Sequence, residues 1–294
     1  MSVLTAVKIG ELSIELLRRQ IVLPALVSRV GSADYTGSGG TTRLRVPVPR
    51  EAHEQKTRGE SIEFDDIVEE EVTVGLHHWY DACNLADEEM TLDLVNFGRQ
   101  VLAPQVASVA TAAENELADV MNGLDEDDEV AWAPEADPDA DEDTLLAIRE
   151  KLSDDEVPLT NRAVAVGTDI ATRLLKIDKF SRADARGAAG LTALESATLG
   201  TIYGMSVVES TAIEKGSAVG FQRSAFAFGN LAPIVPPDVF GASVADNGLA
   251  LRTVRVFNPN TLSNVSVVST FAGASVVEDE SKVKRAIRVG SGGS

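Results

Sequence analysis

Two stretches of alternating residues, separated by a polar segment, constrain this chain more than any other feature. The first, TTRLRVPVP at residues 41–49, places apolar and threonine side chains on one face and arginines and prolines on the other. The second, IEFDDIVEEEVTVGL at residues 62–76, follows the polar segment 50–61. Together they predict a long two-stranded hairpin with a polar tip. Because an isolated hairpin has little core, this one must be stabilised by packing on something else.

The glycine-rich segment before this hairpin, DYTGSGG, has two readings, a phosphate-binding loop or a hinge. A P-loop needs a lysine after the glycines and a helix whose N-terminus helps to hold the anion. No lysine follows Gly37, Gly39 and Gly40, and a strand is predicted where the helix should begin. We therefore interpret these glycines as a hinge from which the hairpin leaves the body.

Two other segments contain residue types that bind metals. DPDADED, at residues 137–143, has the first acidic positions of a calcium loop, but Glu142 occupies the required glycine position and Ile148 the final glutamate position. A weak divalent site remains an alternative there to a solvated acidic loop.

HHWYDAC contains His77, His78 and Cys83, and the only other histidine is His53. A tight metal site needs three or four ligands, so packing or surface roles are expected for these residues. The sequence also contains no Gly-x-Ser-x-Gly elbow and no spacing that supports a histidine triad. It therefore predicts no enzyme, no cofactor and no metal.

The charges are separated along the chain. The 294 residues carry a net charge of −20, with −13 in residues 125–156, −12 in residues 59–98 and +5 in the remainder. Such separation indicates complementary surfaces that meet within a molecule or between copies, or else solubility alone. Sequence-specific nucleic-acid binding is not expected with this balance. The single cysteine, Cys83, excludes an internal disulfide and fits a reducing compartment.

The remaining segments predict an α+β fold, because strands and helices do not alternate regularly. The longest apolar run, residues 21–27, is far shorter than the roughly 20 residues of a membrane helix. Pro104 is expected to kink a long helix or to start a second one. The predicted elements are a helix within 11–30 that ends at Pro24, a helix over 87–123, a helix over 143–153, a strand at 163–166, a helix over 168–177, a strand at 201–210, a strand followed by a short helix over 217–233, and a hairpin over 249–277.

In this order the segments resemble the major capsid proteins of tailed bacteriophages, whose Hong Kong 97-type fold is shared by encapsulin shells. LLRRQIVLPALVSRV is similar to the N-terminal arm of that family, the hairpin to its extended loop, and FGRQVLAPQVASVATAAENELADVMNG to its spine helix. NRAVAVGTDIATRLLKIDKFSRAD, GTIYGMSVVES and SAVGFQRSAFAFGNLAP follow one another as in the axial domain. GLALRTVRVFNPNTLSNVSVVSTFAGASVV resembles the strands that close the peripheral domain.

The resemblance implies an α+β, Hong Kong 97-type capsid fold with an N-arm, an extended β-hairpin loop, a peripheral domain with a long spine helix, and an axial domain. The implied segments are an N-terminal arm at 1–36, an extended loop at 37–76, a peripheral domain with the spine helix at 77–124, an axial domain at 125–248, returning peripheral strands at 249–289 and a flexible tail at 290–294.

The resemblance also implies a function. The chain would be a structural protein that assembles as pentamers and hexamers into an icosahedral shell around double-stranded DNA, within a virion assembled in the host cytoplasm. Its partners would be other copies of itself, a scaffolding protein, a portal and non-specifically packaged double-stranded DNA, with no membrane. The alternatives are an encapsulin-like nanocompartment shell and, more remotely, a soluble phosphate- or metal-dependent enzyme.

The hairpin supplies the candidate contact residues between subunits. On the implied arrangement, the extended loop lies on the next subunit, so its bases are expected to face acids of that neighbour. The bases are Arg43, Arg45, Lys56 and Arg58, and the acids are Glu69, Glu70, Glu71 and Glu88.

Overall fold

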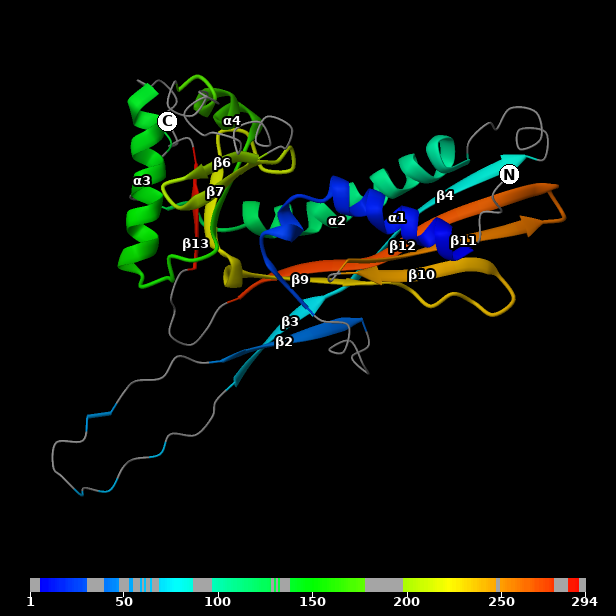
Figure 1. Ribbon diagram of the computed structural model, residues 1–294, viewed down its shortest axis with the longest axis horizontal. Helices are drawn as coiled ribbons and strands as arrows, with labels where there is room; N and C mark the ends of the chain where they lie inside the picture. Colours follow the sequence, from blue (N-terminus) through cyan, green and yellow to red (C-terminus); the bar gives the residue numbers. More distant parts are fainter. Residues whose placement is uncertain are drawn as a thin grey trace.

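The computed structural model describes residues 6–30, 40–47, 69–86, 97–127, 138–177, 198–246, 249–277 and 285–290, with residues 53, 54, 59, 61, 64, 130 and 132. A six-stranded sheet runs along an elongated body, a five-stranded sheet lies at one end, and a two-stranded hairpin lies below the larger sheet (Figure 1). Within these ranges no helix is long and apolar enough to cross a membrane. The predicted α+β class is confirmed.

The six-stranded sheet is built around one long strand, β12. The order is β1–β9–β12–β11–β10, and β4 pairs with the other edge of β12. Residues 263–269 of β12 pair with β11, and residues 271–276 pair with β9. Because β4 also pairs with β12, this strand has three partner strands. The strands are β1 (Ser28–Arg29), β4 (His77–Ala86), β9 (Phe226–Leu231), β10 (Phe240–Asp246), β11 (Leu249–Asn258) and β12 (Ser263–Val276).

A buried polar cluster marks the point where β11 gives way to β9 along β12. Asn230 Nδ2 donates to Thr270 Oγ1 at 2.9 Å and to the carbonyl of Phe271 at 3.1 Å. Its Oδ1 accepts from the amide of Ala250, and Thr270 Oγ1 donates to the Ala250 carbonyl at 2.7 Å. Because these buried groups are satisfied only in one alignment, they fix the register of β9, β11 and β12.

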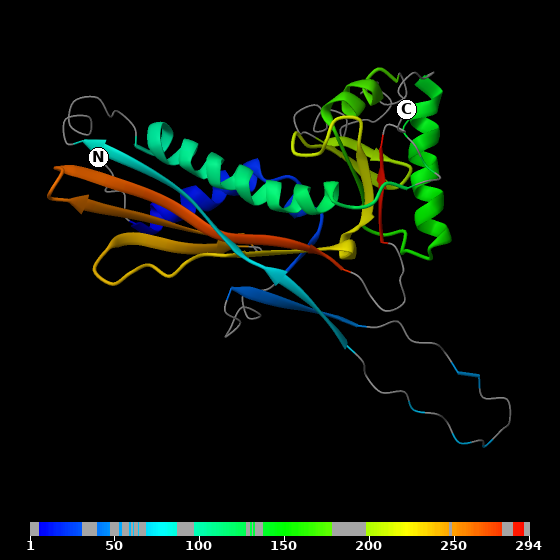
Figure 2. The ribbon, with the colours of Figure 1, turned by 180° about the vertical axis from the view of Figure 1, so that it is seen from behind.

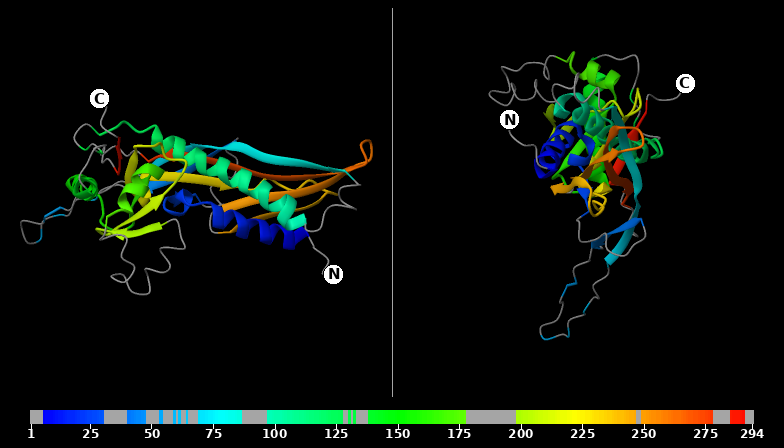
Figure 3. Two further views of the ribbon diagram at one scale, coloured as in Figure 1. Left: turned by 90° about the horizontal axis from the view of Figure 1, so that it is seen from above. Right: turned by 90° about the vertical axis from the view of Figure 1, so that its right-hand side faces the viewer.

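Two helices, α1 (Ala6–Gln20) and α2 (Ala103–Asn122), cover one face of this sheet (Figure 3). A Cβ at Gly10 of α1 would lie 2.5 Å from Val244 Cγ2 of β10, so the close approach of helix and strand requires glycine. In α2, Gln105 Nε2 donates to the carbonyl of Ser266, and the Ser266 hydroxyl donates back to Gln105 Oε1, both at 2.9 Å.

A proline lies near one end of each of these helices. α1 ends at Gln20, before Pro24, which lies in a short 3-10 turn, η1 (Leu23–Ala25), and α1 begins at Ala6, earlier than the predicted range 11–30. A π-helical turn, η4 (Gly98–Leu102), runs without a break into α2, because Leu102 and Ala103 have helical backbone angles and the Ala103 amide donates to the Gly98 carbonyl. Pro104 therefore lies inside one continuous helical run, next to the π-helical turn, and does not start a separate second helix.

The five-stranded sheet has the order β13–β8–β5–β7–β6. All five residues of β5 and of β8 are buried, and a second apolar core that includes Trp132 and Ile148 joins this sheet to its two helices. The elements are α3 (Pro138–Asp154), β5 (Arg162–Val166), α4 (Thr168–Leu174), β6 (Thr198–Ile202), β7 (Met205–Glu209), β8 (Ala218–Gln222) and β13 (Ala286–Val289).

The two sheets share a core. The chain passes directly from β8 to β9 through the turn η6 (Arg223–Ala225), and Phe221 and Phe226 on either side of the turn pack edge to face at 5.4 Å between ring centres. Both rings are fully buried, in the cluster that also contains Leu117 and Met121 of α2 and Val219 of β8. Side chains of both sheets therefore pack in one cluster. Figure 2 shows the two sheets from behind.

The structure describes the base of the predicted hairpin, which is formed by two paired strands. β2 (Thr41–Pro47) pairs antiparallel with β3 (Glu69–Gly75), from Thr41 opposite Gly75 to Pro47 opposite Glu69. Thr42 is buried and Leu44 half-buried, while Arg43 and Arg45 are exposed, so the predicted alternation is confirmed for these residues.

Three segments differ from the predicted division of the chain. β9 and β10, assigned from sequence to the axial segment 125–248, pair within the six-stranded sheet. β13, assigned to the returning peripheral strands, pairs with β8 in the five-stranded sheet. The chain changes sheet at η6, where no shift in composition marks the change, and again after β12, where the charged segment EDESKVKR follows. The helix α1, within the predicted arm, packs against β10, β11 and α2.

Several local predictions were also wrong. Residues 201–210 form a hairpin, β6–β7, because Tyr203 and Gly204 adopt positive φ values of 49° and 81°. Residues 226–231 form the strand β9 and not a helix, since β12 and β1 pair with it. β4 was not predicted, and α3 begins at Pro138, earlier than residue 143. Residues 87–96, where the long helix was expected to begin, lie outside the described residues.

Candidate self-assembly surface

Some of the acidic and basic side chains form ion pairs within the chain. Arg288 Nη2 in β13 lies 2.6 Å from Glu214 Oε2 and 3.5 Å from Glu126 Oε1. Lys151 Nζ in α3 lies 2.7 Å from Asp127 Oδ2, a carboxylate whose side chain is only 8% exposed. These pairs join Glu126 to β13 and Asp127 to α3.

The calcium-like spacing lies largely within a helix. From Pro138 onward these residues belong to α3, and the buried Asp141 accepts hydrogen bonds from Trp132 Nε1 at 2.8 Å and from Arg173 Nη2 at 2.6 Å. Arg173 Nε also donates to the other oxygen at 3.2 Å. Asp141 therefore joins α3 to α4, and Glu142 accepts from the Tyr203 hydroxyl.

The histidines of β4 take part in packing contacts. His77 Nδ1 lies 2.9 Å from Glu116 Oε1 in α2, and Trp79 Nε1 donates to the same oxygen at 3.0 Å. His78 packs on Phe271 with ring centres 4.6 Å apart, and burial, with a smaller effect from nearby Arg252, lowers its pKa. Across the described part of the chain, no three His, Cys, Asp or Glu side chains are grouped as metal ligands.

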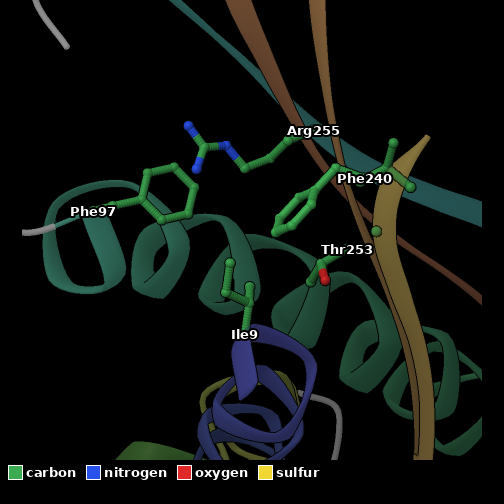
Figure 4. Close-up of a pocket in the computed structure, with 7 residues that line it drawn as sticks. Ile9, Phe97, Phe240, Thr253 and Arg255 are labelled. Atoms are coloured by element: carbon green, nitrogen blue, oxygen red, sulfur yellow. The ribbon is translucent and has the colours of Figure 1, made fainter. Parts of the chain in front are cut away.

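A small hollow opens at the far end of the six-stranded sheet (Figure 4). Phe97, Phe240, Thr253 and Arg255 line it together with Ile9 of α1. The Arg255 guanidinium lies 4.4 Å from the centre of the Phe97 ring, a cation–π geometry. With one guanidinium and mostly apolar walls, this hollow offers packing and no acid–base pair.

Exposed apolar side chains gather around this end of the sheet. We call Phe240, Val256, Phe257 and Leu262 the apolar end; they are 48%, 43%, 50% and 63% exposed. Phe240 lies opposite Arg255, so Phe240 and Phe257 share one face of the sheet, Val256 lies on the other face, and Leu262 lies in the turn between β11 and β12. These exposed apolar side chains at one end of the sheet are candidate contact residues that the sequence pattern did not reveal.

The hairpin is attached to the body by one apolar face. Val72 and Val74 of β3 pack with Ala227 of β9 and with Val277, and Leu44 of β2 lies against them. A Cβ at Gly273 of β12 would overlap the carbonyl oxygen of Gly75, so the chain crosses closely where β3 leads into β4. Figures 1 and 3 show the hairpin on the side of the sheet opposite to α1 and α2.

The charged face of the hairpin carries an ion pair within the chain. Arg43 Nη1 lies 2.9 Å from Glu71 Oε2, with side chains 58% and 45% exposed, and Arg45 lies opposite Glu71 in the ladder. Glu69 and Glu70 occupy positions on β3. Gly40, with φ of 94°, leads into β2, and its carbonyl accepts from the Leu76 amide at 2.8 Å. The other predicted residues, Gly37, Gly39, Lys56, Arg58 and Glu88, lie outside the described residues.

The structure can be compared with known proteins. No family model matches the sequence, and no curated protein matches it. Among solved structures, one from Mycobacterium phage Che8 is 22% identical, with a TM-score of 0.58 over 94% of this chain and 93% of that one. The capsid structure of cyanophage P-SCSP1u is 12% identical, with a TM-score of 0.61 over 94% and 89%.

A third similar structure is a virus-like particle from Pyrococcus furiosus, 9% identical, with a TM-score of 0.53 over 95% of this chain and 96% of that one. At these identities the likeness establishes the fold. It extends over nearly the whole of both chains and covers both sheets. The chain therefore has the Hong Kong 97-type capsid fold of the phage capsid proteins that it resembles.

Proposed function

We propose that this chain is a structural major capsid protein that assembles as pentamers and hexamers into an icosahedral shell enclosing double-stranded DNA. The observation that carries the proposal is the whole-chain likeness in fold to phage capsid structures. Packaged DNA would be held without sequence specificity. A scaffolding protein and a portal would be further partners, in a virion assembled in the host cytoplasm.

Two surfaces of the described residues support self-association. The hairpin packs on its own body through one face only, and its other face carries the exposed Arg43 and Glu71. The apolar end, at the far end of the sheet, exposes two phenylalanines. Both would be covered in a shell in which each chain contacts several copies of itself.

Bases of the hairpin would contact acids of a neighbouring copy. Because Arg43 already pairs with Glu71 within one chain, such contacts would add to this pair or exchange with it. Exposed pairs contribute only about 0–1 kcal/mol each, so their role would be in register and assembly. Lys56 and Arg58 with Glu69, Glu70, Glu71 and Glu88 complete the proposed set.

A second candidate is a nanocompartment shell that encloses an enzyme cargo. A virus-like particle from Pyrococcus furiosus shares this fold with the phage capsid structures, so the fold alone is compatible with either shell. Genes beside the coding sequence separate the two: portal, terminase and scaffolding genes indicate a virus, and a cargo enzyme gene indicates a nanocompartment.

Electron microscopy with sedimentation velocity tests the shared part of both proposals. Uniform hollow shells, or rings of five and six copies, are expected from the purified chain or from the chain co-expressed with its scaffolding gene. A compact monomer under both conditions would contradict a shell role and would favour a soluble enzyme.

Charge reversal in the hairpin tests the proposed contacts. The variant with Arg43→Glu and Arg45→Glu should fold normally but form fewer closed shells, because like charges would then face one another. The variant with Arg149→Glu and Lys176→Glu, two exposed bases outside the hairpin, is the control with the same change in net charge. Normal shell formation by the hairpin variant would exclude these contacts.

A further inference from the structure

A glycine of β12, Gly273, lies where the hairpin joins the body. β4 pairs with β12 as far as His77 opposite Ala272, and the ladder between them ends there. At the next residue, a Cβ on Gly273 would overlap the carbonyl oxygen of Gly75 and would lie 2.9 Å from its carbonyl carbon. Backbone therefore packs directly on backbone at this crossing. Figure 2 shows the chain running from β3 across β12 into β4.

The face of the larger sheet under β3 consists of small residues. Gly273 lies opposite Gly229 of β9, and Ser275 lies opposite Ala227. Paired residues share one face of a sheet, and so do alternate residues along a strand. The intervening residues of both strands belong to the shared core beneath the helices, so these four lie on the opposite face, toward the hairpin. We call them the small-residue patch.

Two apolar residues of β3 cover this patch. Val72 and Val74 are buried, and they pack with Ala227 of the patch and with Val277. If β3 were lifted from the sheet, both valines would be uncovered. The attachment of the hairpin to its own body therefore depends on how closely β3 approaches β9 and β12.

Both strands of the hairpin begin at the same crossing. Thr41, the first residue of β2, pairs with Gly75, the last residue of β3. The amide of Leu76 donates to the carbonyl of Gly40 at 2.8 Å. Beyond Leu76, β4 is held in the sheet by its ladder with β12. The direction of the hairpin therefore depends on the distance at which Gly75 crosses β12.

We propose that Gly273 is a positioning residue, which sets the direction in which the hairpin leaves the body. Because its side chain is a hydrogen atom, β3 can lie on the small-residue patch. A methyl group there would meet backbone atoms of Gly75, which cannot rotate away as the end of a flexible side chain can. The root of the hairpin would then have to move away from β12. The body would keep its fold, because the shared core lies on the other face of the sheet.

The consequence for assembly rests on the proposed shell function. At about 3.3 Å per residue, the 7 residues of β2 extend about 23 Å from the crossing. A small rotation at the crossing therefore displaces the other end of β2 by several ångström. A hairpin that left the body at another angle would miss its contacts on a neighbouring copy. Gly273 would thus act on the contacts between copies through the hairpin.

The test compares hydrogen exchange in the unassembled, full-length parent, Gly273→Ala and Gly75→Ala. Gly273→Ala should accelerate exchange in β2 and β3 by about tenfold or more, because local opening sets the exchange rate, and should leave β5 and β8 at the rates of the parent. Gly75→Ala is the matched control at the other glycine of the crossing. A Cβ there would meet no atom of the described residues within 4 Å, so its rates should match those of the parent.

Two results for Gly273→Ala would overturn the proposal. Exchange in β2 and β3 at the rates of the parent would show that the hairpin has not moved. Equal acceleration in β2, β3, β5 and β8 would show that Gly273 supports the core and does not position the hairpin.

A second variant keeps the test decisive if Gly273→Ala does not fold. Ala227→Leu enlarges another residue of the small-residue patch, where Val72 and Val74 pack, and should detach the hairpin in the same way. Exchange in β2 and β3 at the rates of the parent would contradict the proposal. Failure of both variants to fold would also contradict it, because displacement of the hairpin would then unfold the body.

Electron microscopy separates this proposal from the proposed function. If the parent forms shells, Gly273→Ala should form fewer closed shells, and Gly75→Ala should form as many as the parent. If the parent forms none, the shell function fails, and the exchange rates still decide whether Gly273 positions the hairpin. Normal shells from a Gly273→Ala chain with accelerated exchange in β2 and β3 would overturn the consequence for assembly.

Discussion

The shared core and the hairpin are stabilised to very different extents by their own chain. In the core, helices and both sheets bury large side chains such as Phe221, Phe226 and Leu117 completely. The base of the hairpin buries Val72, Val74, Ala227 and Val277, and its opposite face is exposed. The comparison indicates that the core specifies a folded body within one chain, whereas the hairpin depends on contacts beyond itself.

Phe221→Ala should have the largest effect on stability, because it removes a side chain from the shared core. Phe221 is fully buried and packs against Phe226 at the crossing between the sheets. Removing the ring should lower the free energy of unfolding by roughly 3–5 kcal/mol. Urea unfolding followed by circular dichroism measures this loss, and both sheets should unfold in one transition. Two separate transitions in the parent protein would contradict a shared core.

Val74→Ala should have a smaller and local effect. Val74 is fully buried, but it belongs to the small cluster at the base of the hairpin. The loss of two methyl groups should cost about 1–2 kcal/mol, felt mainly as detachment of β2 and β3 from the body. Hydrogen exchange should accelerate in β2 and β3 and stay unchanged in β5 and β8. Equal acceleration in all four strands would place the hairpin within the core unit.

Arg43→Ala should have the smallest effect on stability. Its ion pair with Glu71 is exposed, and such pairs contribute about 0–1 kcal/mol, less at high salt. The melting temperature of the unassembled chain should therefore change little. A large loss of stability would show that the charged face of the hairpin supports the body directly.

The sequence predicted elements whose pattern is local. The alternation in residues 41–45 predicted the two faces of β2, and Pro24 lies after the end of α1 as expected. The α+β class followed from the order of strands and helices, and the capsid fold from the resemblance of successive segments. These features depend on neighbouring residues or on their order, which sequence displays directly.

Other features depend on distant residues and could not be predicted. β4 has no clear alternation of burial, because its exposed residues lie on both faces and its ladder comes from β12. β13 joins the small sheet through β8, far away in sequence. The apolar end arises only when β10 and β11 pair. Gly273 is one of many glycines, and only folding places it against Gly75.

The most direct test of the central claim is a cryo-electron microscopy map of the assembled particle, in which each hairpin can be traced. The hairpin should extend from the base formed by β2 and β3 and lie on the body of a second copy, with the core of each chain unchanged. A hairpin folded back on its own chain, with no contact to a neighbour, would contradict the account.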